Sequence, residues 1–108
     1  MRPVVLSVTG VGTSVPDPLD HYLTPFNVSL AVVVTGTITY TVQYTYDDVF
    51  AANYDPATGN WLPHPSLTAQ TATKDSNIAY PVRAVRLTTS AGTGTAALTV
   101  IQAGGGGL

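Results

Sequence analysis

The sequence has no cysteine and very little charge. Of its 108 residues 9% are charged, with no glutamate and a single lysine. A typical soluble protein carries roughly a quarter charged residues, so uncharged polar groups have to cover most of this surface. Without cysteine, disulfides, thiolate catalysis, iron–sulfur clusters and cysteine zinc sites are all excluded.

The shortage of charge also argues against two kinds of partner. Four basic residues and a formal net charge of -2 cannot neutralise many phosphates, so we expect no nucleic acid partner. We expect no membrane partner either, since no polybasic segment is present and the longest apolar run, Leu30 to Val34, is far too short to span a bilayer. The first residues do not resemble a secretory signal, which favours synthesis in a cytoplasm.

Threonine and valine are abundant, with seventeen and fourteen copies. Both are β-branched and favour strands, and 44% hydrophobic residues are enough for one core. We therefore predict a single all-β domain over residues 1–103, either an antiparallel β-sandwich or a jelly-roll-like fold. The run of glycines in 104–108 has no side chains to pack and is predicted to be a separate tail.

The period-two alternation of apolar and polar residues locates the strands. It predicts a first strand from Val4 to Val8, and two hairpins, one formed by 27–34 with 37–46 and one by 81–89 with 95–103. Three prolines in 13–25 predict a loop or an edge strand, and 47–79 is predicted to be irregular with at most short strands.

One predicted strand has a face rich in tyrosine. Its alternation places Ile38, Tyr40, Val42, Tyr44 and Tyr46 together. A tyrosine ring buries apolar area while its hydroxyl needs a polar partner. Two interpretations therefore stay open: a core edged by tyrosine hydroxyls, or a tyrosine strip presented to another protein.

The irregular middle of the chain contains the candidate binding residues. Aromatic residues flank the turn at 55–60, and a rigid Pro-His-Pro segment follows them. Large aromatic and apolar side chains are typical anchors of protein interfaces, and aromatics also stack on sugar rings. We predict interface residues at Phe50, Tyr54, Trp61, Leu62 and His64.

The sequence offers no set of residues for catalysis. His21 and His64 lie in proline-rich loops, and no nucleophile motif accompanies them, so we expect no enzyme and no cofactor. Asp47, Asp48 and Asp55 provide the oxygen ligands that calcium prefers, but their spacing matches no known calcium loop. We interpret them as solvated turn residues, and cation binding there stays open.

As a whole, the chain resembles the small, cysteine-free, Thr/Val/Gly-rich β proteins among the virion structural proteins of tailed bacteriophages, in particular the head decoration or cement proteins. The likeness is one of composition, from Val4 through the strand at 37–46 to the glycine tail. It implies a non-enzymatic protein made in the bacterial cytoplasm, bound to the major capsid protein on the virion surface as a dimer or trimer. The alternatives are a head–tail connector, a tail or fibre attachment protein, and a carbohydrate-binding module.

Overall fold

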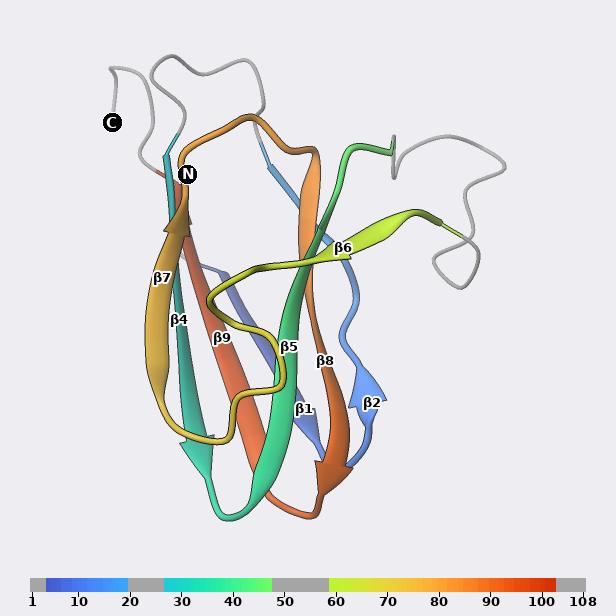
Figure 1. Ribbon diagram of the computed structural model, residues 1–108, viewed down its shortest axis with the longest axis vertical. Helices are drawn as coiled ribbons and strands as arrows, with labels where there is room; N and C mark the ends of the chain where they lie inside the picture. The colour runs from blue at the N-terminus through green and yellow to red at the C-terminus, as the bar shows by residue number, and fades with distance from the viewer. Residues whose placement is uncertain (1–3, 20–26, 48–58, 103–108) are drawn as a thin grey trace.

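The structure, a computed structural model, describes residues 4–19, 27–47 and 59–102. Within these ranges the chain forms nine strands in two antiparallel sheets and no helix (Figure 1). The all-β prediction is therefore confirmed. The predictions made for Phe50, Tyr54, Asp48, Asp55 and the tail at 104–108 lie outside the described residues. A search of the described residues finds no helix that could cross a membrane.

Each sheet has four strands in its main hydrogen-bonded order. The first sheet runs β1 (Val4–Thr9), β9 (Thr95–Gln102), β4 (Val28–Thr35) and β7 (Lys74–Ile78). The second runs β2 (Gly12–Thr13), β8 (Ala84–Gly92), β5 (Ile38–Thr45) and β6 (Trp61–Pro63), and the short β3 (Asp17–Pro18) also pairs with β8. The short edge strands β2 and β3 agree with the loop or edge strand predicted for 13–25, as far as the structure describes it, to residue 19.

One hydrophobic core receives side chains from both sheets. The alternation of each strand directs every second side chain inward, where burying a leucine or valine contributes roughly 1.5–3 kcal/mol. Leu30 and Leu98 enter the core from the first sheet, and Tyr40 and Leu87 from the second, each with 0% of its surface exposed. The hydroxyl of Tyr40 donates a hydrogen bond to the carbonyl of Ala72 at 2.7 Å, so its polar end is satisfied inside the protein.

The two predicted hairpins are wrong in their pairing. β4 and β5 belong to different sheets, and so do β8 and β9; each connection crosses from one sheet to the other at the same end of the molecule (Figure 1). A hairpin would place both apolar faces on one side of one sheet, whereas a crossing connection turns them toward each other and buries both. The two connections also bond together, since the carbonyl of Thr37 accepts from the amides of Thr93 at 3.0 Å and Gly94 at 2.8 Å.

The tyrosine face of β5 is divided between core and surface. Ile38, Tyr40 and Val42 are fully buried, whereas Tyr44 is half-buried and Tyr46 is 54% exposed. The first half of this face therefore belongs to the core, while its end leaves Tyr44 and Tyr46 partly exposed at the surface.

Candidate protein-binding surfaces

The short strand β6 places its two large residues on opposite sides of the second sheet. Trp61 pairs with Thr45 of β5, and Leu62 pairs with Tyr44. Neighbouring residues of a strand point to opposite faces, so Trp61 shares the outer face with Thr45, and Leu62 shares the side of Tyr44. Of the predicted interface residues, Trp61 and Leu62 therefore lie on opposite faces of the sheet at its β6 edge.

The Trp61 ring is held in place by a cation. The guanidinium carbon of Arg86 lies 4.2 Å from the ring centroid, and its Nε donates to Oε1 of Gln43 at 2.8 Å. Such cation–π contacts contribute about 0.5–2 kcal/mol. The indole Nε1 is buried and has no hydrogen-bond partner in the part of the chain that the structure describes, so a donor beside the half-buried ring is unsatisfied there.

Three tyrosines cluster next to Leu62. The Tyr44 ring centroid lies 6.0 Å from that of Tyr46 and 5.7 Å from that of Tyr80, both in edge-to-face contact. A hydrogen bond to Tyr44, together with burial and the neighbouring hydroxyls, raises the pKa of Tyr80 to about 12. Leu62 and Tyr80 are more than 40% exposed. We call the surface formed by Tyr44, Tyr46, Trp61, Leu62 and Tyr80 the aromatic edge.

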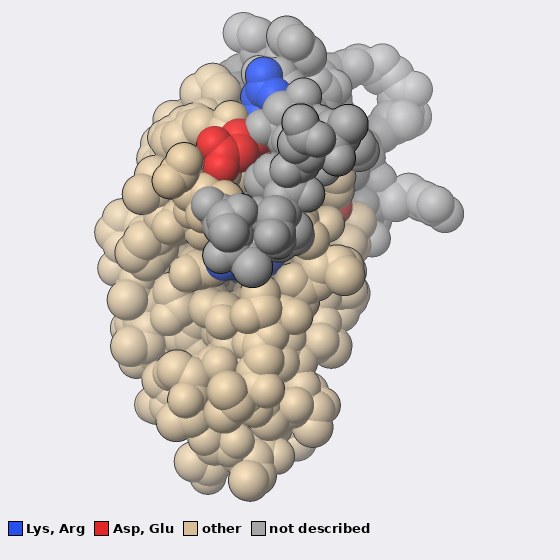
Figure 2. All heavy atoms as spheres, turned by 90° about the vertical axis from the view of Figure 1, so that its right-hand side faces the viewer, with Lys and Arg blue, Asp and Glu red and all other residues tan. Residues whose placement is uncertain are grey.

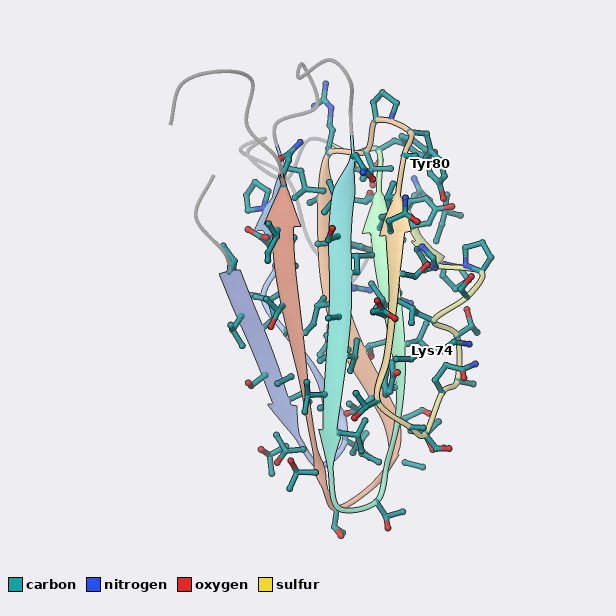
Figure 3. All side chains as sticks on the ribbon, turned by 90° about the vertical axis from the view of Figure 1, so that its left-hand side faces the viewer. Lys74 and Tyr80 are labelled. Carbon is teal, nitrogen blue, oxygen red and sulfur yellow. The ribbon has the colours of Figure 1, made fainter. Side chains whose placement is uncertain are left out.

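Tyr80 was not among the predicted interface residues. It follows β7, between Ala79 and Pro81, where no strand pattern is visible in the sequence. Figure 3 shows Tyr80 just beyond the end of β7. Only the packing of β7 beside the second sheet brings it to Tyr44, so no local signal identifies it.

His64 lies inside the protein, and we leave it out of the candidate surface. Its side chain is 4% exposed, its Nδ1 accepts from the amide of Ser66 at 3.1 Å, and its Nε2 lies 2.9 Å from the carbonyl of Asn77. Because Nδ1 accepts, the proton resides on Nε2 and is donated to Asn77. The ring thus joins the β6 side of the second sheet to β7 of the first.

Asp17 is a buried carboxylate at the opposite edge of the second sheet. Its side chain is 7% exposed, its Oδ2 has no hydrogen-bond partner among the described residues, and burial raises its pKa above 3.8. A pKa raised in the folded state means that folding favours the protonated acid. The stability this group contributes is complete below pH 3.8 and is lost as the pH rises through the folded-state pKa.

Asp17→Asn is therefore expected to stabilise the protein at pH 7 by roughly 1 kcal/mol, because the buried charge is removed. Urea denaturation at pH 7 and at pH 3 measures the difference, which should vanish at pH 3. Asp75→Asn, at an exposed position of β7, controls for the change in net charge. Equal effects of Asp17→Asn at both pH values would contradict the assignment.

The outer face of the first sheet is nearly uncharged over the described residues. Its large exposed residues are Val5, Val33 and Ile101, which are 60%, 53% and 45% exposed. The strand registers surround them with serine, threonine, alanine and asparagine, and Asp75 at the β7 edge is the one charged residue that the described strands place on this face. Figure 2 shows another side of the molecule, the one toward β2 and β8, and its lower half is likewise without Lys, Arg, Asp or Glu. Depletion of charged residues is typical of the centre of protein interfaces.

The aspartates considered for cation binding are only partly described. Oδ2 of Asp47 accepts from the amide of Asn60 at 2.7 Å, which fixes the turn before β6. Among residues 4–19, 27–47 and 59–102 no three His, Cys, Asp or Glu side chains are grouped as metal ligands would be.

Comparison with known protein families, curated protein sequences and solved structures finds no match to this chain.

Proposed function

We propose that the two sheets form a β-sandwich of the jelly-roll type. If the short β3 is set aside, β1 pairs with β9, β2 with β8, β4 with β7 and β5 with β6. The first of these eight strands thus pairs with the last, the second with the next to last, and so on inward. This nesting is that of one long hairpin rolled into two sheets, which is the jelly-roll arrangement of two Greek keys. The crossing connections from β4 to β5 and from β8 to β9 support the same arrangement.

We propose that the protein is a non-enzymatic virion component, a decoration or cement protein that binds the major capsid protein. The observation that carries this proposal is the nearly uncharged outer surface, with Asp75 as the charged residue on the described outer face of a four-stranded sheet. A surface poor in charge suits permanent contact with other protein. The jelly-roll strand order gives further support, because viral capsid domains use it.

The aromatic edge is the proposed contact with the capsid. Tyrosine and tryptophan are enriched in interfaces because a rigid ring buries much area at a small entropic cost. Symmetry repeats the contact over the shell, and linked contacts require only modest affinity from each copy. The protein would be made in the bacterial cytoplasm, act on the virion surface and form a homo-oligomer.

Trp61→Ala is expected to weaken attachment to particles by roughly 30-fold, the size of a ~2 kcal/mol interface hot spot, without unfolding the domain. The fold should persist because Trp61 lies outside the hydrophobic core. Occupancy on purified particles measures attachment, and circular dichroism measures folding. Val15→Ala is a matched control, since Val15 is 73% exposed and lies between β2 and β3, on the far side of β8 from β6. Unchanged occupancy of Trp61→Ala would remove Trp61 from the interface.

Mass spectrometry of purified virions tests the virion role itself. Hundreds of copies per particle support decoration of the shell, while about a dozen or fewer support a head–tail connector or a tail or fibre attachment protein. Absence from virions refutes every virion role. The neighbouring genes give an independent test, since a capsid protein encoded directly upstream is expected.

A carbohydrate-binding module is the second candidate, and the tyrosine cluster favours it. Exposed aromatic rings stack on sugars, and lectin domains also use the jelly-roll strand order. Binding on a glycan array, accompanied by quenching of Trp61 fluorescence, would support this function over virion attachment.

A further inference from the structure

The strand β1 is an open sheet edge. Its hydrogen-bonded neighbour among the described strands is β9 alone, and Figure 3 draws it as the outermost strand of the first sheet. Its six residues, VVLSVT, include no charge, proline or glycine. An uncharged edge of this kind presents unpaired backbone groups that pair readily with another strand.

The other three sheet edges carry the features that prevent such pairing. β7 contains Lys74 and Asp75, and β6 ends at Pro63. At the edge formed by β2 and β3, Pro18 lies in β3 and Pro16 comes just before it. Charges and prolines are the usual protections of edge strands. Among the described sheet edges, β1 is therefore the one that lacks these protections and can pair with another strand.

The register identifies which backbone groups of β1 are free. The β1–β9 register, extended by one position beyond Thr9 and Thr95, sets Gly10 opposite Gly94, and the amide of Gly10 donates to the carbonyl of Gly94 at 2.9 Å. Hydrogen-bonded pairs alternate along an antiparallel ladder, so the even-numbered residues of β1 bond to β9. The amides and carbonyls of Val5, Ser7 and Thr9 therefore point outward from the sheet.

We propose that β1 pairs antiparallel with β1 of a second copy of this chain, about a twofold axis at Ser7. In this register Ser7 lies opposite Ser7, and Val5 lies opposite Thr9 of the other copy. Each of the three outward-pointing residues then exchanges both hydrogen bonds with its partner. Leu6 faces Val8 on the inner side, so the two cores adjoin and the two four-stranded sheets become one continuous sheet.

The chemistry of β1 fits a second copy. The strand has no charges, so antiparallel pairing with itself brings no like charges opposite each other. Leu6 and Val8, the buried residues of the strand, are similar in size and meet across the axis. A single strand pair buries less than the roughly 1,200 Å² of stable complexes, so the dimer should dissociate at about micromolar concentration. The dimer does not depend on the proposed virion role.

A cysteine placed on the proposed axis tests the register directly, because the natural chain has no cysteine. In Ser7→Cys the two Cα atoms lie about 5.5 Å apart, which suits a disulfide. In the control Val5→Cys the two cysteines are separated by four residues along the strand, about 13 Å. Both positions are exposed on the outer face.

The cross-linking is carried out in a glutathione redox buffer at about 100 µM protein, well above the expected dissociation constant. Most Ser7→Cys molecules should then become covalent dimers. Val5→Cys should cross-link at least about tenfold more slowly, since its cysteines cannot meet in this register. Equal rates for the two variants, or no cross-linking of Ser7→Cys, would overturn the proposal.

Sedimentation of the cysteine-free chain provides the second measurement. The wild-type protein should be a dimer at about 100 µM, and Ser7→Lys, which sets two like charges opposite each other on the axis, should be a folded monomer. Hydrogen exchange should show protected amides at Val5, Ser7 and Thr9 in the dimer and fast exchange in Ser7→Lys. A monomeric wild-type protein, or a dimeric Ser7→Lys, would refute the pairing.

Discussion

Replacing Gly94 by alanine is expected to destabilise the protein by about 3–5 kcal/mol, a large part of the 5–15 kcal/mol typical of a domain. Gly94 lies in the connection between β8 and β9, against the connection between β4 and β5. An added Cβ would overlap the carbonyl oxygen of Thr35 and lie 2.8 Å from the amide nitrogen of Thr37. These are backbone atoms, so the overlap is relieved only if the two connections separate and lose the bonds between them.

Gly12→Ala is the matched control for Gly94→Ala. Its Cβ would meet Cγ1 of Val8 at 3.5 Å, which is an ordinary packing distance. Neither glycine has a positive φ, so the two substitutions differ in the space around the Cβ rather than in backbone strain. Guanidinium denaturation should show a near-neutral effect for Gly12→Ala. A loss for Gly94→Ala no larger than that of the control would show that the two connections are not in close contact.

Leu67→Ala is expected to cost about 2–5 kcal/mol, because it removes a fully buried side chain and leaves a cavity. Leu67 lies between β6 and β7, in a segment without regular strand structure, yet its side chain is 0% exposed. Its carbonyl accepts from the amide of Val42 at 2.9 Å, and its amide donates to His64 at 3.1 Å. The side chain thus anchors the segment that covers the edge of β5 beyond β6.

Leu62→Ala is the same chemical change at a side chain that is 43% exposed, and it should cost less than about 1 kcal/mol. Urea denaturation of both variants provides the comparison. If Leu67→Ala were as mild as Leu62→Ala, the segment after β6 would not be part of the core.

The strands themselves were predictable because their signal is local. In β1 and β5, β-branched and aromatic residues alternate with polar ones, and this pattern depends only on the strand having one buried face. The choice of pairing partner is not local. A short turn after Val34 is compatible with a hairpin and with a crossing connection, and the burial of two apolar faces against each other decides between them only in the complete fold.

The candidate surface, like the fold, was predictable only in part. Trp61 and Leu62 were predicted because large aromatic and apolar side chains are typical interface anchors, and the structure leaves Trp61 half-buried and Leu62 exposed. The burial of His64 was not predicted, because it depends on Asn77, which reaches His64 only through the pairing of β7 with β4. Tyr80 was missed for the same reason, since its contact with Tyr44 arises from tertiary packing.

The nested pairing of the strands also determines when the protein can fold. Val4 of β1 pairs with Val100 of β9, so the ladder between these two strands is complete only after β9 has left the ribosome. Pairings between distant segments carry a high contact order, and folding of such β proteins takes milliseconds to seconds. During synthesis β1 therefore lacks its partner β9, and the first sheet is completed only after β9 has been translated.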